Sequence, residues 1–421
     1  MKRLLCLVIL VLFSSIVASA KTHPRRRLAS SAVPTPSSAG ALRKILELED
    51  HRTSKDRFLS ASVLSPSAAV SRAAILALGR IGDTSGFEEM ARIMNAGNQE
   101  LKAIASFSLG IIGGDFPLKL LVQQAALNKS PDVLAPVLVG MGRAGNEKTQ
   151  EILARYLAPA GNARVIESAC LGLGLLWSGK SESWEIPDGV LIRLAQISNG
   201  DTLPALSAAF ALSRYKGDQK ALPVKEIIEA LGGSQLVYGK GFLVKALAKT
   251  KNPTISAALV KLLSSDDSLY APLQVEAAKA MAAQDPTSVG ITAIQGLLSS
   301  SNAGVLVTAL ETLATYGQPA GMAQGAVDKL YQTSSSVWVR GAALKTLARL
   351  SPTTTRPKLL EILGDKLSAV RPAAANAIAG INSPEDGDLI ASLITENDLK
   401  VVEEALDGLM LWGGRGNLFP D

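Results

Sequence analysis

A short apolar pattern recurs from about residue 65 almost to the end of the chain. An aliphatic residue is usually followed four positions later by a small residue, and after four more by Leu or Met, as in Val70, Ala74 and Leu78. Eleven such frames start 31 to 39 residues apart, at Val70, Leu101, Val133, Val165, Pro204, Gly239, Leu273, Val305, Val339, Val370 and Val401. A period of this length is typical of solenoids, in which each unit packs chiefly on its neighbours. The repeat therefore predicts one extended domain.

Each repeat has room for two helices. Residues four apart lie on one face of an α-helix, so each frame marks a buried helical face, and its small residue marks a close approach of a neighbouring helix. In the first unit we expect a helix over 70–80, a turn at 81–83 and a second helix over 87–94. The predicted fold class is all-α, a right-handed α-solenoid of about eleven two-helix repeats. Acidic residues that recur in the turns are expected to cap the following helix, namely Asp83, Asp218 and Asp285.

The motif of the first unit is Val-x-x-x-Ala-x-x-x-Leu-Gly-x-Ile-Gly-Asp, over residues 70–83. It resembles the HEAT repeat, in the short variety first associated with phycobilisome lyases. The resemblance covers about residues 65–413 and implies HEAT-like repeats, which are used mostly to bind other macromolecules. It also implies that the second helix of each repeat lines the concave surface of the solenoid.

A narrower likeness lies at the start of the array. Residues 45–52 and 76–83 are similar to the N-terminal HEAT region of exported bacterial proteins that carry a cyclophilin-type prolyl isomerase domain behind the repeats. The Phe-x-Arg and Gln-Gly-Gly-Asp signatures of a cyclophilin do not occur in the sequence. The resemblance therefore does not extend to isomerase activity.

The N-terminal segment has the features of a secretory signal. Two basic residues precede an apolar run over residues 4–17, and the small residues Ala18-Ser19-Ala20 follow. We predict a signal peptide over residues 1–20, a flexible basic and Pro-rich tether over 21–40, N-terminal capping helices over 41–66 and the repeat solenoid over 67–421. The protein is expected to be exported, periplasmic or extracellular, without a transmembrane helix after signal cleavage. We also expect the C-terminal residues 418–420 to fold back as a cap.

The net charge of +6 is unevenly distributed. Residues 21–57 hold nine basic and four acidic side chains, whereas residues 58–421 hold 32 basic and 33 acidic ones. A nucleic-acid-binding body needs a basic stripe, so we predict no nucleic-acid partner. The basic arm formed by Arg25, Arg26 and Arg27 is expected either to make weak contact with an anionic surface or to act as a spacer.

The sequence offers little for catalysis. Both histidines, His23 and His51, precede the repeats, and Cys170 is the one cysteine outside the predicted signal. The phosphate-loop spacing at 174–181 and the G-x-G-x-x-G spacing at 140–145 fall at predicted helix ends, without the strand that such loops need. We therefore predict no catalytic residue, no cofactor and no metal site.

The candidate partner-binding residues come from two kinds of position. The longest repeat interval contains an insertion over 177–187 with two tryptophans, which would either contact a partner or cover a break in the stacking. Polar residues of the second helices would form a binding face or a plain solvated face. The candidates are Trp177, Trp184, Lys119, Gln123, Arg193, Gln196, Lys261 and Lys329.

From these features we expect a non-catalytic scaffold that binds a protein or peptide partner in the cell envelope. The alternative is a repeat protein associated with an enzyme, accessory to a prolyl isomerase or to a lyase-like activity.

Overall fold

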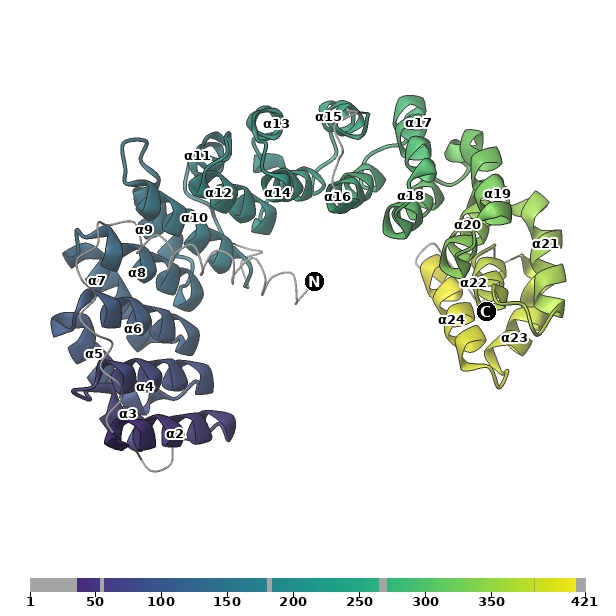
Figure 1. Ribbon diagram of the computed structural model, residues 1–421. Helices are drawn as coiled ribbons and strands as arrows, with labels where there is room; N and C mark the ends of the chain where they lie inside the picture. The colour runs from purple at the N-terminus through teal and green to yellow at the C-terminus, as the bar shows by residue number, and fades with distance from the viewer. Residues whose placement is uncertain (1–35, 54–56, 180–183, 265–270, 382, 414–421) are drawn as a thin grey trace.

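The computed structural model describes residues 36–53, 57–179, 184–264, 271–381 and 383–413. Within these ranges the chain forms 23 α-helices joined by short turns and 3-10 segments, and no strand. The helices follow one another in an open arch of two layers (Figure 1). The α-solenoid predicted from the repeat is confirmed.

The first helix of each repeat lies in the inner layer of the arch, which faces its hollow (Figure 1). These helices carry the Val-Ala-Leu frames, and the first unit has the predicted helix, turn and helix. The inner helices are α4 (Ala68–Ile81), α6 (Gln99–Ile112), α8 (Pro131–Ala144), α10 (Ala163–Trp177), α12 (Leu203–Arg214), α14 (Val237–Leu247), α16 (Ala271–Ala282), α18 (Ala303–Tyr316), α20 (Val337–Leu350), α22 (Arg371–Ile381) and α24 (Leu399–Gly413).

The second helix of each repeat lies in the outer layer, on the convex side of the arch (Figure 1). The expectation that the second helices line the concave surface is therefore wrong. The outer helices are α5 (Phe87–Ala96), α7 (Asp115–Leu127), α9 (Thr149–Ala154), α11 (Val190–Ile197), α13 (Val224–Gly233), α15 (Pro253–Leu263), α17 (Ser288–Gly296), α19 (Gln324–Thr333), α21 (Pro352–Gly364) and α23 (Gly387–Ile394).

Close contact between inner helices explains why the arch curves toward them. A Cβ atom added to Gly110 of α6 would lie 2.7 Å from the Cα of Gly140 in α8. One added to Gly142 of α8 would lie 2.3 Å from the carbonyl oxygen of Gly172 in α10. Glycine thus lets the backbones of α6, α8 and α10 touch, whereas the outer helices fan out on the convex side (Figure 1). A stack with unequal spacing on its two sides bends toward the closer side.

Replacing Gly142 by alanine should lower the free energy of unfolding by about 2 kcal/mol, because the new methyl group meets backbone atoms that cannot rotate away. Urea denaturation followed by circular dichroism measures the change. Gly232→Ala in α13 is the matched control, since nothing lies within 4 Å of a Cβ added there. Alanine favours the helix, so this variant should be more stable by up to about 1 kcal/mol. Equal destabilisation of the two variants would contradict the close approach of α8 and α10.

Asparagine side chains cap the N-termini of several inner helices. The side-chain oxygen of Asn98 accepts a hydrogen bond from the backbone N–H of Leu101 at 2.9 Å, and Asn162 and Asn302 cap α10 and α18 in the same way. Such caps satisfy N–H groups that have no partner within the helix. They fix where each repeat starts.

The turn aspartates behave as predicted at two of three positions. Asp83 accepts from the N–H of Ser85 and Asp218 from that of Lys220, each at the start of a 3-10 turn. Asp285 forms an ion pair with Lys251 at 2.9 Å, and no capping bond of its side chain is found among the described residues. Thr287 caps α17 instead, so the capping role predicted for Asp285 is wrong.

Two helices precede the first repeat, α2 (Pro36–Asp50) and α3 (Phe58–Val63). Ile45, Leu59 and Val63 are fully buried and join the core of the repeats. They lie where capping helices are expected, but α2 begins within the predicted tether, which therefore ends before Pro36. The predicted signal peptide, the basic arm and the C-terminal cap at 418–420 lie outside the described residues.

Candidate protein-binding surface

The inner helices present a regular set of side chains to the hollow of the arch. The frame residues pack against the outer layer, and the residue six positions after the start of a frame points away from it, because each residue turns the helix by about 100°. From α4 to α12 these residues are apolar, and from α14 to α20 they are charged. In chain order they are Leu76, Phe107, Val139, Leu171, Phe210, Lys245, Lys279, Glu311 and Lys345.

The apolar half of this surface contains a cluster separate from the core between the layers. Leu171 and Phe210 are 8% and 2% exposed, and the partly exposed side chains around them come from α8, α10, α12 and α14. We call this cluster the inner apolar stripe; its members are Val139, Leu171, Leu175, Leu206, Phe210 and Phe242. The rings of Phe210 and Phe242 meet edge to face at 5.5 Å. The stripe runs across four consecutive inner helices.

Two arginines lie on aromatic rings along this surface. The guanidinium carbon of Arg143 is 5.1 Å from the ring centre of Phe107, and that of Arg214 is 5.2 Å from the ring centre of Phe210. The Nε atoms of both arginines are buried and have no hydrogen-bond partner among the described residues. Burial lowers the pKa of both guanidinium groups. Each arginine therefore holds a desolvated donor beside an apolar surface.

Arg214 also lines a pocket of about 510 Å³ at the C-terminal end of α12. Its other lining residues are Ser178, Ser213, Tyr215, Lys216, Gly217, Gln219 and Lys249. The Nζ atom of Lys249 donates to three backbone carbonyls that follow one another around this helix end, including that of Ser213 at 2.7 Å. Burial, together with the positive charges of Arg214 and Lys216, lowers the pKa of Lys249 to about 8. We call this the basic pocket.

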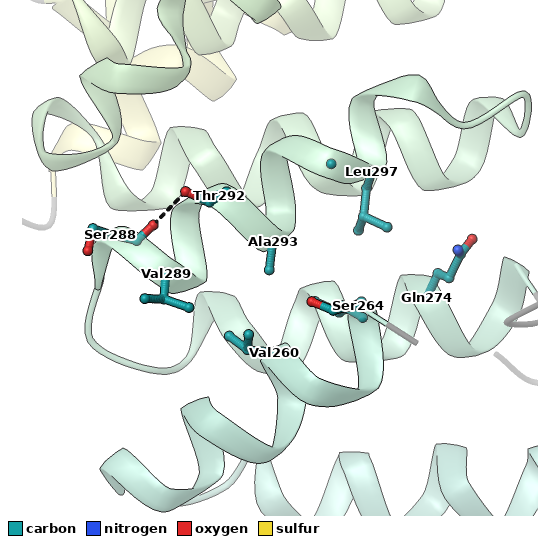
Figure 2. Close-up of a pocket in the computed structure, with 10 residues that line it drawn as sticks. Val260, Ser264, Gln274, Ser288, Val289, Thr292, Ala293 and Leu297 are labelled. Carbon is teal, nitrogen blue, oxygen red and sulfur yellow. Dashed lines mark hydrogen bonds between the residues drawn. The ribbon is translucent and has the colours of Figure 1, made fainter. Parts of the chain in front are cut away.

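A second pocket, of about 560 Å³, lies between the outer helices α15 and α17 (Figure 2). Val260, Val289 and Leu297 point toward the space between the two helices, and Ser264 and Gln274 lie at one side of it. Thr292 donates a hydrogen bond to the carbonyl of Ser288 at 2.9 Å within its own helix. The ten residues drawn around this pocket carry no side chain that titrates near neutral pH. It is a hollow of mixed polar and apolar lining, without charged groups.

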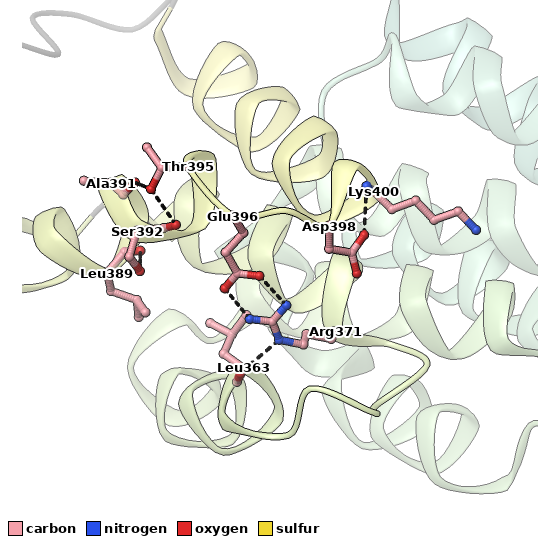
Figure 3. Close-up of polar contacts among 9 residues, drawn as sticks. All are labelled: Leu363, Arg371, Leu389, Ala391, Ser392, Thr395, Glu396, Asp398 and Lys400. Carbon is pink, nitrogen blue, oxygen red and sulfur yellow. Dashed lines mark hydrogen bonds and ion pairs between the residues drawn. The ribbon is translucent and has the colours of Figure 1, made fainter.

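Two ion pairs, each with one buried partner, connect neighbouring elements in the C-terminal repeats. Arg371 at the start of α22 donates to both carboxylate oxygens of Glu396, at 2.7 and 2.5 Å, and its Nε donates to the carbonyl of Leu363 at 3.0 Å (Figure 3). Arg356 of α21 bonds in the same forked way to Asp386, which is buried. These pairs join successive repeats and lie away from the inner apolar stripe.

The two candidate tryptophans of the insertion have different positions. Trp177 is the last residue of α10 and is fully buried, with its ring 5.7 Å from that of Tyr215. A partner cannot touch it in this conformation, so its prediction as a contact residue is wrong; the alternative, that it covers a break in the stacking, stays a prediction. Trp184 is partly exposed and packs against the core.

The polar candidates lie on outer helices and not on the concave face. Lys119 and Gln123 of α7, Gln196 of α11, Lys261 of α15 and Lys329 of α19 are exposed on that layer. Arg193 of α11 is held by the carbonyl of Leu157 at 2.8 Å and by Gln196 at 3.3 Å. The structure does not bring these six residues together into one site. Sequence reasoning missed the inner apolar stripe, although the residue six positions after the start of the frame is apolar in each of the first five repeats.

Metal sites and membrane-spanning helices are not found among the described residues. In the part of the chain that the structure describes, no group of three or more His, Cys, Asp or Glu side chains could hold a metal ion. None of the described helices combines the length and the apolar character needed to cross a membrane. Cys170 is fully buried in α10, and burial raises the pKa of its thiol far above the usual range.

Two layers of stacked helical hairpins define the class of protein as an α-solenoid. More particularly, residues 323–410 match the family of HEAT repeats. This match covers α19 to α24 up to Met410 and confirms the HEAT-like character predicted from the first unit.

Kap121p is a solved structure with a similar fold. The chain resembles Kap121p in its complex with Pho4p, with a TM-score of 0.52 and 14% identity over 94% of this chain; it spans only 50% of that chain. An engineered protein has a TM-score of 0.40 and 20% identity, with 84% of this chain and 97% of that chain covered. Human deoxyhypusine hydroxylase has a TM-score of 0.29 and 16% identity, with 66% and 98% covered. No curated protein matches the sequence.

Proposed function

We propose that this protein is a non-catalytic scaffold that binds a protein partner along its inner apolar stripe. The observation that carries the proposal is the stripe itself, a connected apolar surface on the hollow side of a solenoid, outside the core that holds the repeats together. Partly exposed apolar side chains beside arginines on aromatic rings are typical of protein interfaces. The HEAT match and the solenoid fold agree with this role, since solenoids bind partners on extended concave surfaces.

We further propose that the protein acts outside the cytoplasm, in the periplasm or the extracellular space. The support is the sequence of residues 1–20, with basic residues, an apolar run and small residues in the order of a secretory signal. The basic arm with Arg25, Arg26 and Arg27 would follow the cleavage site. Mass spectrometry of the mature N-terminus in the producing cell tests this step, which predicts a chain beginning at Lys21.

The binding proposal is tested by changing the stripe without changing the core. Leu206 of α12 is a partly exposed member of the stripe, so Leu206→Asp should leave the melting temperature within a few degrees of the native value. We expect it to reduce capture of a partner from cell-envelope extract at least about tenfold, because a carboxylate would be desolvated in the interface. Quantitative mass spectrometry of the captured proteins measures this.

Ile192→Asp is the matched control on the opposite side of the solenoid. Ile192 is 45% exposed on the outer helix α11, and the same charge is introduced there. Capture should be unchanged in this variant. Loss of capture in Ile192→Asp with full capture in Leu206→Asp would place the interface on the outer layer and contradict the proposal.

A further inference from the structure

We propose that the inner surface selects a polypeptide segment in which carboxylate side chains stand beside apolar ones, with a carboxylate bound by Arg214 and the apolar side chains placed on the inner apolar stripe. This inference rests on the proposed function and adds the chemistry of the partner. Arg214 carries it, because one side chain belongs to both the apolar stripe and the basic pocket.

Arg214 lies between the inner apolar stripe and the basic pocket. Its guanidinium packs on the ring of Phe210, which belongs to the stripe, while its side chain lines the basic pocket with Lys216 and Lys249. Its Nε is buried and unpartnered within the described chain, whereas the side chain as a whole is partly exposed, so its outer N–H groups are the ones that a ligand can reach. A buried donor without an acceptor is costly, and a carboxylate is the acceptor that suits a guanidinium best. The site is therefore short of negative charge.

Several other cations of the inner helices have carboxylate partners. Arg72 and Arg80 of α4 pair with Glu100 and Glu49 at 3.0 and 2.7 Å. Within the four helices of the stripe, Arg164 pairs with Asp132 and Lys245 with Glu276, and in α20 Lys345 pairs with Glu404. Arg143, Arg214 and Lys249 differ from these cations, because no carboxylate pairs with them among the described residues.

The acidic groups around the stripe do not neutralise these cations. α10 contributes Glu167, which is 8% exposed, and burial raises the pKa of its carboxyl group. The side chain of Asp218 accepts from the backbone N–H of Lys220 in the turn after α12. Lys216 donates to the carbonyl of Gly179 at 2.6 Å, which satisfies one of its donors, and no carboxylate pairs with it among the described residues. Charge complementarity therefore favours an acidic ligand.

The inner apolar stripe has the length of a short extended peptide. Packed helices are about 8–10 Å apart. Four inner helices thus span roughly 25–30 Å, the length of about eight or nine extended residues. The stripe members around Leu171 and Phe210 are partly exposed along this length, so they form an open track and not an enclosed tunnel. An open track suits a polypeptide, whereas the chain of a fatty acid would need enclosure.

Three fluorescein-labelled peptides of twelve residues test the inference with the full chain. Each alternates leucine with one other residue, which is glutamate, glutamine or lysine, and fluorescence anisotropy measures binding. We expect the glutamate peptide to bind at least about tenfold more tightly than the glutamine peptide and the lysine peptide to bind most weakly. Arg214→Met should weaken binding of the glutamate peptide about tenfold and leave the glutamine peptide unchanged.

Two further variants keep the test valid if Arg214→Met fails to fold. Lys216 is exposed at the basic pocket, and Lys216→Met should weaken the glutamate peptide about threefold. Arg193→Met is the matched control on the outer layer and should change nothing. Melting curves establish that each variant is folded.

Several results would contradict the inference, and each can be told apart from a failure of the proposed function. Equal affinity for the glutamate and glutamine peptides, with both lost in Leu206→Asp, would overturn the acidic preference while leaving the proposed function intact. The inference would also be wrong if the glutamate peptide did not bind, or if both Arg214→Met and Lys216→Met left its binding unchanged. Tighter binding of oleate than of the glutamate peptide, in competition for the same surface, would assign the surface to a lipid and overturn it.

Discussion

Replacing Trp177 by alanine should lower the free energy of unfolding by about 4 kcal/mol, the largest stability effect that we expect in this chain. The side chain is fully buried at the end of α10, and its Nε1 donates to the side-chain oxygen of Gln150 at 3.4 Å. Gln150 in turn donates to the carbonyl of Glu185, which holds the segment that begins at Trp184 against α9. Removal of the indole would leave a cavity and an unsatisfied amide.

Urea denaturation followed by circular dichroism measures this effect. Neighbouring repeats dominate the stability of a solenoid, so an early transition confined to the units around α10 is the expected form of the loss. Trp338→Ala is the control, because Trp338 of α20 is 84% exposed. It should change the unfolding free energy by less than about 0.5 kcal/mol. A Trp177→Ala variant as stable as Trp338→Ala would contradict the buried position.

Replacing Arg371 by methionine should cost roughly 2 kcal/mol, because Arg371 is buried and its loss leaves the partly exposed Glu396 carboxylate and the carbonyl of Leu363 without their donor (Figure 3). Methionine keeps most of the volume of the arginine side chain, so the loss reports on the polar contacts. Arg43→Met removes an equivalent cation from the exposed pair with Glu47 and should change stability by less than about 0.5 kcal/mol. Thermal and urea unfolding compare the two variants.

The same pair predicts how the stability depends on pH. The hydrogen bond from Arg371 holds the pKa of Glu396 below its usual value. In the unfolded chain the pKa of this carboxyl is about 4.3, so the pair contributes fully above that pH and its contribution is lost as pH falls through the lower folded value. The stability difference between the native chain and Arg371→Met should therefore shrink below about pH 4. A difference that grows on acidification would contradict the assignment.

The repeat frame predicted the helices well because it reports local physics. Val70, Ala74 and Leu78 must share one helical face, and all three are buried as expected. The frame could not tell which layer lies inside the arch, since a buried face is equally needed in either layer. That choice depends on how closely backbones approach between repeats, and the sequence signal for it is glycine in matching positions, as at Gly142 and Gly172.

The candidate site was harder to predict for two physical reasons. Trp177 was assigned to a loop because its repeat is long, yet α10 continues to that residue and the irregularity begins after it. The basic pocket joins Arg214 of α12 to Lys249, which follows α14, and residues from different repeats carry no fixed spacing that reveals their contact. The same holds for Arg371 and Glu396, whose pairing follows from the turn before α24.

Backbone contact within the inner layer also determines how the arch can deform. At Gly110 and Gly140, as at Gly142 and Gly172, the inner helices cannot move closer, so the inner layer from α6 to α10 has nearly constant length when the solenoid bends. In this part of the arch the neutral surface of bending therefore lies near the inner side, and changes in curvature are taken up by the spacing of the outer helices α7 and α9 (Figure 1). A ligand track on the inner side would keep its spacing while the span of the arch changes.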